Sequence, residues 1–223
     1  MRPALPLTCA ASLLLAITLP AAAQTSPWTL RTGPARVTLH TETRLSVAGN
    51  DVPGAAVAAS GSTLVGLELG RRLDEAWTAR LAIGLPPPES TLRTAGSLQA
   101  MVPPLSGTLG RVQYAPLVLT ATWSPGRWGA LQPYVGAGIN HTRITRTEDG
   151  DLSGLTVDHA WGSVLQLGAS WALDARWALF ADARTVRLKT TARGQLTALG
   201  GLPAEAKVRL DPTIVHIGLE YRP

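Results

Sequence analysis

The side-chain pattern of this sequence predicts an all-β fold: an eight-stranded antiparallel up-and-down transmembrane β-barrel. Three observations support this prediction. Apolar residues recur at every second position, short and long connections alternate along the chain, and tryptophans fall near the ends of the alternating segments. After residue 23 the sequence contains no run of roughly 18 apolar residues, the length that a transmembrane helix needs. A chain that is 45% hydrophobic and has this pattern is expected to cross a membrane as strands.

The first segment has the features of an export signal. Arg2 gives a positive start, residues 5–19 are mostly apolar, and Ala21-Ala22-Ala23 supplies the small residues of a cleavage site. We expect residues 1–23 to be a signal peptide and residues 24–223 to form one outer-membrane β-barrel domain in a Gram-negative bacterium. Cys9 is the only cysteine of the sequence and lies in this leader, so the exported chain has no disulfide.

Eight segments with period-two alternation follow the leader and are assigned to strands. They span residues 28–42, 62–73, 76–85, 110–124, 131–144, 159–173, 177–192 and 207–222. The clearest apolar faces, in chain order, are Val65, Leu67 and Leu69; Trp77, Ala79, Leu81 and Ile83; Leu117, Leu119, Ala121 and Trp123; Trp161, Leu165, Leu167 and Trp171; and Val215, Ile217, Leu219 and Tyr221. Each segment is long enough to cross a bilayer as a tilted strand.

The connections between these segments alternate in length. Residues 73–75, 124–130 and 174–176 form short links, whereas residues 43–61, 86–109, 145–158 and 193–206 are long and rich in Gly, Pro, Ser and Thr. Bacterial outer-membrane barrels have short periplasmic turns and longer external loops. The alternation therefore predicts which end of the barrel faces the periplasm.

The face opposite each apolar stripe combines glycine with charged residues, which suits a narrow polar lumen. The charged lumen positions are Arg31, Glu68, Arg72, Arg80, Asp182, Arg184, His216, Glu220 and Arg222. A soluble sandwich or lipocalin-like barrel would instead turn its apolar face inward. Six tryptophans near strand ends favour the membrane barrel, because aromatic girdles lie at both bilayer interfaces; core packing is the alternative role. They are Trp28, Trp77, Trp123, Trp161, Trp171 and Trp177.

The charge of the chain does not indicate nucleic-acid binding. The 20 basic and 15 acidic residues give a formal net charge of +5, and the basic residues are spread along an exported chain. We expect contact with outer-membrane lipid and lipopolysaccharide, assistance from the barrel-insertion machinery during biogenesis, and a monomeric state. No cofactor, metal site or nucleic-acid partner is expected.

Four motifs resemble the OmpW family of outer-membrane proteins. The run from Gln132 to Thr142 resembles that family's Pro-Tyr-Val-Gly-x-Gly signature. The other three motifs run from Gly107 to Leu119, from Trp161 to Gly168, and from Asp211 to Arg222. The chain departs from the family at Ala115-Pro116, where a double proline is usual, and at Pro223, where an aromatic residue is usual. The resemblance implies passive passage of small hydrophobic molecules across the outer membrane.

An eight-stranded barrel is only wide enough for side chains, so paired lumen charges would block a straight aqueous pore. A solute would then enter through a hydrophobic gate in the second long loop and leave sideways into the bilayer. Pro116 cannot donate a backbone hydrogen bond, so we interpret it either as the lateral opening or as a strand-rim residue. Pro133 and Pro212 are interpreted as rim residues. The hydrophobic gate candidates are Leu92, Leu98, Met101, Val102, Leu105 and Leu109.

Two other functions remain open from the sequence. One is a structural, adhesive or receptor barrel without transport. The other, which the sequence favours less, is a lipid-modifying barrel enzyme. His159 beside Asp158 and near Ser163 is the best catalytic candidate, by proximity alone. We therefore expect no enzymatic activity and assign no catalytic residue.

Overall fold

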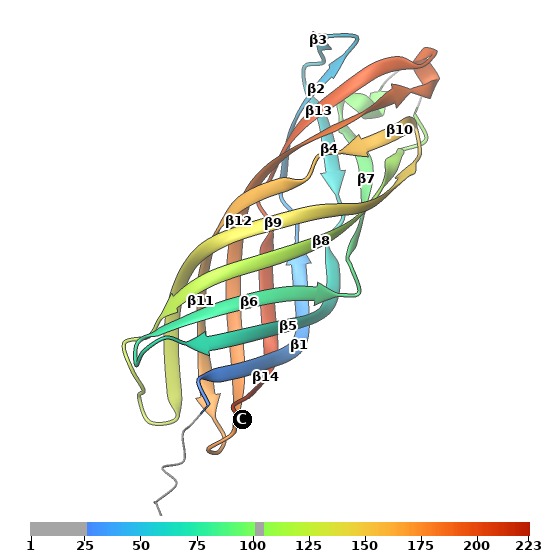
Figure 1. Ribbon diagram of the computed structural model, residues 1–223. Helices are drawn as coiled ribbons and strands as arrows, with labels where there is room; N and C mark the ends of the chain where they lie inside the picture. Colours follow the sequence, from blue (N-terminus) through green and yellow to red (C-terminus); the bar gives the residue numbers. More distant parts are fainter. Residues whose placement is uncertain (1–25, 101–104) are drawn as a thin grey trace, which may run out of the picture.

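The computed structural model describes residues 26–100 and 105–223 of the chain (Figure 1). The expected signal peptide lies outside the described residues and stays a prediction, and Met101 and Val102 lie outside them as well. Two short 3-10 helices are present, η1 (Ser97–Ala100) and η2 (Thr197–Leu199). Within the described ranges, no helix has both the length and the apolar character needed to cross a membrane.

Eight strands form a closed antiparallel barrel, as predicted. Strand β1 pairs with β5 and β14, and each remaining wall strand pairs with the wall strands before and after it in the sequence. Closure leaves no open edge in the bilayer, where an unpaired backbone group would be costly. The wall strands are β1 (Trp28–Thr38), β5 (Ser62–Arg72), β6 (Trp77–Leu85), β8 (Thr108–Trp123), β9 (Leu131–Asp149), β11 (Ala160–Ala172), β12 (Trp177–Leu196) and β14 (Thr213–Tyr221).

The long connections are largely strands, which differs from the loops that their composition suggested. They contain β2 (Thr41–Val47), β3 (Asn50–Asp51), β4 (Ala55–Ala59), β7 (Glu89–Gly96), β10 (Leu152–Val157) and β13 (Leu202–Leu210). Strands β9 and β12 are 19 and 20 residues long, well beyond the roughly 10 that a bilayer requires. The ends of the wall strands that protrude from the barrel offer free backbone groups for further pairing. Strands β13 and β10 pair with the outer part of β12, and β7 pairs with the outer part of β8. These strands form the upper end of the molecule in Figure 1.

The barrel turns its apolar side chains outward and its polar side chains inward. On β11, Leu167 is 63% exposed, whereas the adjacent Gln166 is 4% exposed. Five of the predicted tryptophans are exposed near the short turns, at the end that such barrels turn to the periplasm, and Trp128 in one of those turns joins them. Trp161 is the exception, since it lies at the outer end of β11, where its ring packs on His141.

The interior is layered along the barrel axis. Along β12, Phe180, Asp182 and Arg184 come first from the periplasmic end, Val186 and Leu188 follow, and Ala192 and Leu196 lie in the outer extension. The outermost residues belong to a large apolar cluster, and the middle residues belong to a smaller one. Polar residues therefore fill the periplasmic half of the barrel, and apolar residues fill the outer half.

Candidate functional site: an apolar chamber above a charged plug

The outer half of the barrel contains an apolar cavity of about 130 Å³, here called the chamber. All four external connections contribute to its lining. Leu45 and Val57 come from the first, Leu98 from the second, Leu152 from the third and Leu196 from the fourth. Alternation along β2, β4, β10 and the outer end of β12 turns Leu45, Val57, Leu152 and Leu196 toward the axis, and Leu98 comes from η1. The chamber therefore forms because the external connections fold as strands that extend the barrel outward.

The structure places the four described gate candidates in or against this chamber. Leu92, Leu98 and Leu109 line it, and Leu105 packs against the surrounding apolar cluster. Leu98 lies in η1 and is only 1% exposed, because its side chain points into the chamber. The chamber residues of the other three connections were missed. The period-two pattern in residues 41–47 and 202–210 would have been the signal for two of these connections.

Acidic side chains fasten the external connections over the chamber. The Asp151 carboxylate accepts hydrogen bonds from the backbone N–H groups of Ser106 and Gly107, at 3.1 and 3.2 Å, and so joins the third connection to the second. The Asp149 carboxylate accepts hydrogen bonds from the N–H groups of Leu155 and Gly154, which hold the pKa of this carboxyl below its usual value. These contacts fix the turn between β9 and β10.

The strand pairing of the barrel wall is interrupted beside the chamber, where β7 replaces β6 as the partner of β8. Strand β8 pairs with β6 as far as Leu117 and with β7 from Gln113 onward. Between them, the N–H of Tyr114 donates to the carbonyl of Pro88. Pro116 is two residues further along, so its nitrogen faces the same side and has no hydrogen to donate. Residues 86–88, which join β6 to β7, are all prolines, and Pro116 also lines the chamber.

The other two prolines occupy different settings. Pro133 is the third residue of β9, near its periplasmic start. Pro212 lies between β13 and β14, and its carbonyl accepts a hydrogen bond from the N–H of Val186. Pro34 was missed: it lies within β1, and the β1–β14 ladder is interrupted at Gly33 and Pro34.

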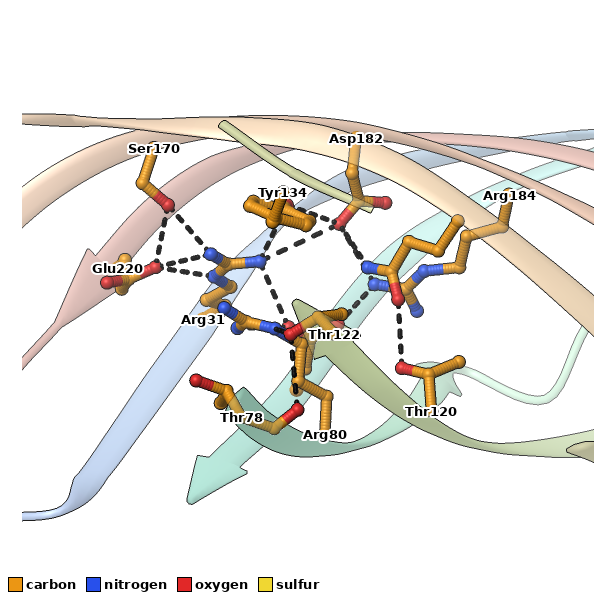
Figure 2. Close-up of polar contacts among 12 residues, drawn as sticks. Arg31, Thr78, Arg80, Thr120, Thr122, Tyr134, Ser170, Asp182, Arg184 and Glu220 are labelled. Atoms are coloured by element: carbon orange, nitrogen blue, oxygen red, sulfur yellow. Dashed lines mark hydrogen bonds and ion pairs between the residues drawn. The ribbon is translucent and has the colours of Figure 1, made fainter. Parts of the chain in front are cut away.

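Below the chamber, buried charges form a compact network, here called the plug (Figure 2). The Arg31 guanidinium is at its centre. It binds Glu220 at 2.6 Å and Glu68 at 3.2 Å, and it donates to the Tyr134 hydroxyl at 2.8 Å and to Ser170 Oγ at 2.7 Å. Five hydrogen-bond donors in a planar group allow one arginine to join several strands in this way.

Glu68 is the second centre of the plug. Its carboxylate binds Arg31, Arg80 at 3.0 Å, and Arg184. Arg184 also binds Asp182 at 3.0 Å, and Asp182 accepts hydrogen bonds from the Tyr134 hydroxyl and from Gln166. Three buried arginines thus face three buried carboxylates, those of Glu68, Asp182 and Glu220. The pairing compensates the desolvation of each charge, which an isolated buried ion could not tolerate.

The remaining predicted lumen charges surround this network. His216 is buried with its ring against Phe180. Arg222 pairs with Glu220 at 2.6 Å, and both Arg222 and Arg72 line an open hollow at the periplasmic end. Arg72 is exposed, since β5 ends there and the barrel opens. The plug therefore separates this periplasmic hollow from the chamber.

Glu68, Asp182 and His216 bring their ligand atoms within 4.8 Å of one another, a spacing that suits a metal ion. The charges around these three residues do not suit a metal ion. Both carboxylates already bind arginines, and a divalent cation would have to enter beside three guanidinium groups. We assign no metal to this cluster.

The catalytic candidate of the sequence is engaged in other contacts. His159 Nδ1 accepts a hydrogen bond from the N–H of Ile144 at 3.0 Å. Asp158 binds Arg193 through both carboxylate oxygens, at 3.0 and 3.1 Å. An acid that orients a catalytic histidine must bind that histidine, and these contacts hold the two residues in separate structural roles.

Known proteins resemble this chain in sequence and in fold. The OmpW family profile matches residues 29–223. The "Dibenzothiophene metabolism operon protein PahQ" of Pseudomonas aeruginosa is 34% identical, over 96% of this chain and 93% of its own length. The outer membrane protein AlkL of Ectopseudomonas oleovorans is 25% identical, over 79% of this chain and 73% of its own length.

Two solved structures share the architecture. The outer membrane protein OprG from Pseudomonas aeruginosa superposes with a TM-score of 0.80 and 22% identity, covering 89% of this chain and 97% of its own. AlkL in lipid bilayers gives a TM-score of 0.65 at 21% identity, covering 99% of this chain and 96% of its own. At these identities the likeness establishes the fold. Together with the family profile over residues 29–223, it shows that this chain belongs to the OmpW family and is a protein of the outer membrane.

Proposed function

We propose that this protein lets small hydrophobic molecules cross the outer membrane passively, through the chamber and then sideways into the bilayer near Pro116. The observation that carries this proposal is the position of the chamber directly above the plug. An apolar solute gains by leaving water for the chamber. To continue along the axis it would have to displace buried ion pairs, which costs several kcal/mol for each charge left unpaired, of order 3–5 kcal/mol.

The wall beside Pro116 supports the sideways step. A closed barrel in lipid normally pairs every backbone N–H with a carbonyl of the neighbouring strand. Pro116 and the prolines at 86–88 cannot donate such bonds, so the wall beside the chamber has fewer bonds to break. The lipid outside is as apolar as the chamber, so the free energy of an apolar solute differs little between the chamber and the bilayer.

The size and lining of the chamber point to compact, uncharged molecules. Apolar cavities of about 150 Å³ in other proteins bind benzene, and the chamber has a similar volume. Two relatives that are each 34% identical are named for a dibenzothiophene metabolism operon, and dibenzothiophene is a flat, uncharged aromatic compound. We therefore include small aromatic molecules in the solute class of this chain.

The proposal includes the route to the membrane. Residues 1–23 direct export through the periplasm and are removed, and residues 24–223 insert as a monomer with the help of the barrel-insertion machinery. A non-enzymatic role follows from the same proposal. Lipopolysaccharide surrounds the outer half of the barrel.

Uptake of a fluorescent naphthalene derivative into liposomes tests transport. Leu98→Ser together with Leu109→Ser places hydroxyls in the chamber, and we expect uptake to fall by about tenfold. Leu202→Ser is the matched control, because Leu202 is exposed on β13 and touches solvent. If wild-type protein gives no more uptake than empty liposomes, the transport proposal is wrong and an adhesive or structural barrel takes its place.

A second pair of variants tests the sideways step. Pro116→Ala restores a backbone donor at the weak point of the wall, and we expect slower uptake into the lipid phase. Pro133→Ala, near the periplasmic start of β9, should leave uptake unchanged. Equal rates for Pro116→Ala and wild type would contradict the lateral opening without affecting the chamber.

A further inference from the structure

The outer extension has a basic surface on the outside of β12, β13 and β2. Outward side chains of these strands form two cross-strand rows. The first row consists of Lys189, Arg209 and Glu42, and the second of Thr191, Lys207 and Arg44. Thr190 and Val208, on the opposite face of the same strands, line the chamber, so the two rows face away from the barrel axis. We call Lys189, Arg209, Lys207 and Arg44 the basic face.

The basic face is electrostatically costly as it stands. Lys189 lies directly opposite Arg209, and Lys207 lies directly opposite Arg44. Like charges in directly opposite positions destabilise a strand pair. Lys189 and Arg44 have no ion-pair partner among residues 26–100 and 105–223. Lys207 and Arg209 have acidic partners at 3.3–3.7 Å that are at least partly exposed, and such solvent-accessible contacts contribute little. An anion bound here would relieve the repulsion.

The position of the basic face relative to the bilayer indicates which anion is near. Along the outside of β12, Leu179, Ala181 and Ala183 come first, and Thr185, Arg187 and Lys189 follow. The apolar band of β12 thus ends at Ala183, and the basic face begins three outward positions further along the strand, at Lys189. Arg36 on β1 and Arg143 on β9 are exposed at the corresponding ends of their apolar stripes.

The two membrane boundaries of the barrel therefore differ in the residues that they expose. Among the described tryptophans, Trp161 alone lies at the outer boundary, and the rest lie at the periplasmic one. Tryptophan suits an interface of ordinary phospholipid head groups. Exposed arginine and lysine suit a leaflet whose head groups are anionic.

The spacing of the four cations suits phosphate groups. Neighbouring strands lie about 4.8 Å apart, and residues i and i+2 about 6.7 Å apart along one strand. The four residues lie on three adjacent strands, β12, β13 and β2, so their backbone positions span a patch of roughly 10 by 7 Å. They border a surface hollow of about 670 Å³, which His159 and Asp158 also line. Lysine and arginine around one hollow can bind several phosphate oxygens at once through charge-assisted hydrogen bonds.

The geometry points to a binding site for the phosphorylated head group of lipid A, the anchor of lipopolysaccharide, on the basic face. Lipid A carries its phosphates just beyond the level where the acyl chains end, and the basic face lies just beyond the end of the apolar band of β12. This site shares no residue with the gap at Pro116, and its side chains point away from the chamber. The inference is therefore independent of the proposed transport function.

Binding of fluorescent lipid A to the full-length barrel in detergent micelles tests the site. We expect wild-type protein to bind bisphosphorylated lipid A about tenfold more tightly than phosphate-free lipid A. The triple variant Arg44→Gln, Lys189→Gln, Lys207→Gln should lose this preference. The control triple variant Arg71→Gln, Arg127→Gln, Arg176→Gln removes the same charge from the periplasmic end and should keep the preference.

Three outcomes would overturn the inference: equal binding of the two lipids by wild-type protein, an unchanged preference in the first triple variant, or a lost preference in the control. Millimolar inorganic phosphate should displace lipid A only weakly, since it lacks the acyl chains. Full displacement would identify a site for free phosphate instead. Heat-dependent gel mobility shows whether each variant is folded, and naphthalene uptake by the first triple variant should equal that of wild type.

Discussion

At the scale of single residues, Glu68 holds the plug together. Its carboxylate is the shared partner of Arg31, Arg80 and Arg184, which come from three different strands. A buried ion pair adds little net stability by itself, because desolvation opposes the Coulombic gain. Removing one partner is a different matter, since the charges that remain stay buried without compensation.

Glu68→Gln is therefore expected to destabilise the barrel strongly. Three guanidinium groups would share the two remaining buried carboxylates, Asp182 and Glu220, at a cost of about 3–5 kcal/mol. Urea unfolding in lipid vesicles, followed by tryptophan fluorescence, measures this cost. Glu42→Gln, at an exposed position, should change the free energy of unfolding by less than about 0.5 kcal/mol. A loss below about 1 kcal/mol for Glu68→Gln would mean that Glu68 does not hold the plug together.

Asp149 provides a pH-dependent contact in the outer extension. The N–H groups of Leu155 and Gly154 stabilise its charged form and lower its pKa. The stabilisation is present above the unfolded pKa of about 3.9 and is lost as the pH falls through the lower folded pKa. The amide chemical shifts of Leu155 and Gly154 should titrate with a midpoint below about 3.9. Asp149→Asn should abolish this titration, and a midpoint at or above that value would contradict the assignment.

At the scale of elements, the seam between β1 and β14 closes the barrel under tight spatial limits. Gly33 and Gly218 lie against each other where Pro34 interrupts the ladder. A Cβ added to Gly33 would fall on the carbonyl oxygen of Ile217, and one added to Gly218 would fall on that of Thr32. The two strands approach so closely here that only glycine fits.

Gly218→Val is expected to prevent closure of the seam. The new side chain must push β1 away from β14, so the variant should show a reduced fraction of the folded, heat-modifiable species on unboiled gels. Ala181→Val on the neighbouring β12 adds bulk to the lipid face and is the matched control, because Ala181 is exposed. A folded fraction equal to that of the control would show that the strands can separate at low cost.

The wall elements were predictable from the sequence, and the outer extension was not. Alternation such as that of Leu165, Gln166 and Leu167 fixes both the strand and its face, because lipid outside and a polar lumen inside oppose each other. In the extension, water lies outside and the interior is apolar, so the polarity is reversed. The Gly, Pro, Ser and Thr residues of the connections therefore suggested loops where short strands form. Some of these strands pair with partners far away in sequence, as β2 does with β13.

Of the candidate site, too, one part was predictable from the sequence and the other was not. The plug residues could be identified as lumen positions by parity along each strand, yet parity does not say which charge meets which. Arg31 reaches Glu220 and Glu68 because barrel closure brings β14 and β5 to either side of β1. The chamber needed the fold itself, since Leu45 and Leu196 come from connections on opposite halves of the chain.

At the scale of the whole molecule, the barrel contains two compartments with different linings. The outer compartment is apolar and borders the wall at Pro116, and the periplasmic hollow is open and lined largely by polar and charged residues. Between them lies the plug, where buried charges are paired in a space that an eight-stranded barrel fills with side chains. Under the proposed function, transport of apolar solutes and exclusion of ions are then separable properties of one structure.

This separation predicts opposite effects of one double variant. Arg31→Ser with Glu220→Ser removes a matched ion pair and leaves Glu68 and Asp182 bound to Arg80 and Arg184. Ionic conductance in planar bilayers should rise from near the background level, because two long side chains no longer fill the axis. Naphthalene uptake should stay within about twofold of wild type, since the sideways route does not cross the plug.

A control with the same net charge change is available at the periplasmic rim. Glu75→Ser with Arg176→Ser alters two exposed residues that line the hollow and should leave conductance at the wild-type level. A wild-type barrel that already conducts ions as well as the plug variant would mean that water passes the buried charges. Apolar solutes would then have an axial route as well, and the weak wall at Pro116 would no longer be needed to explain their release.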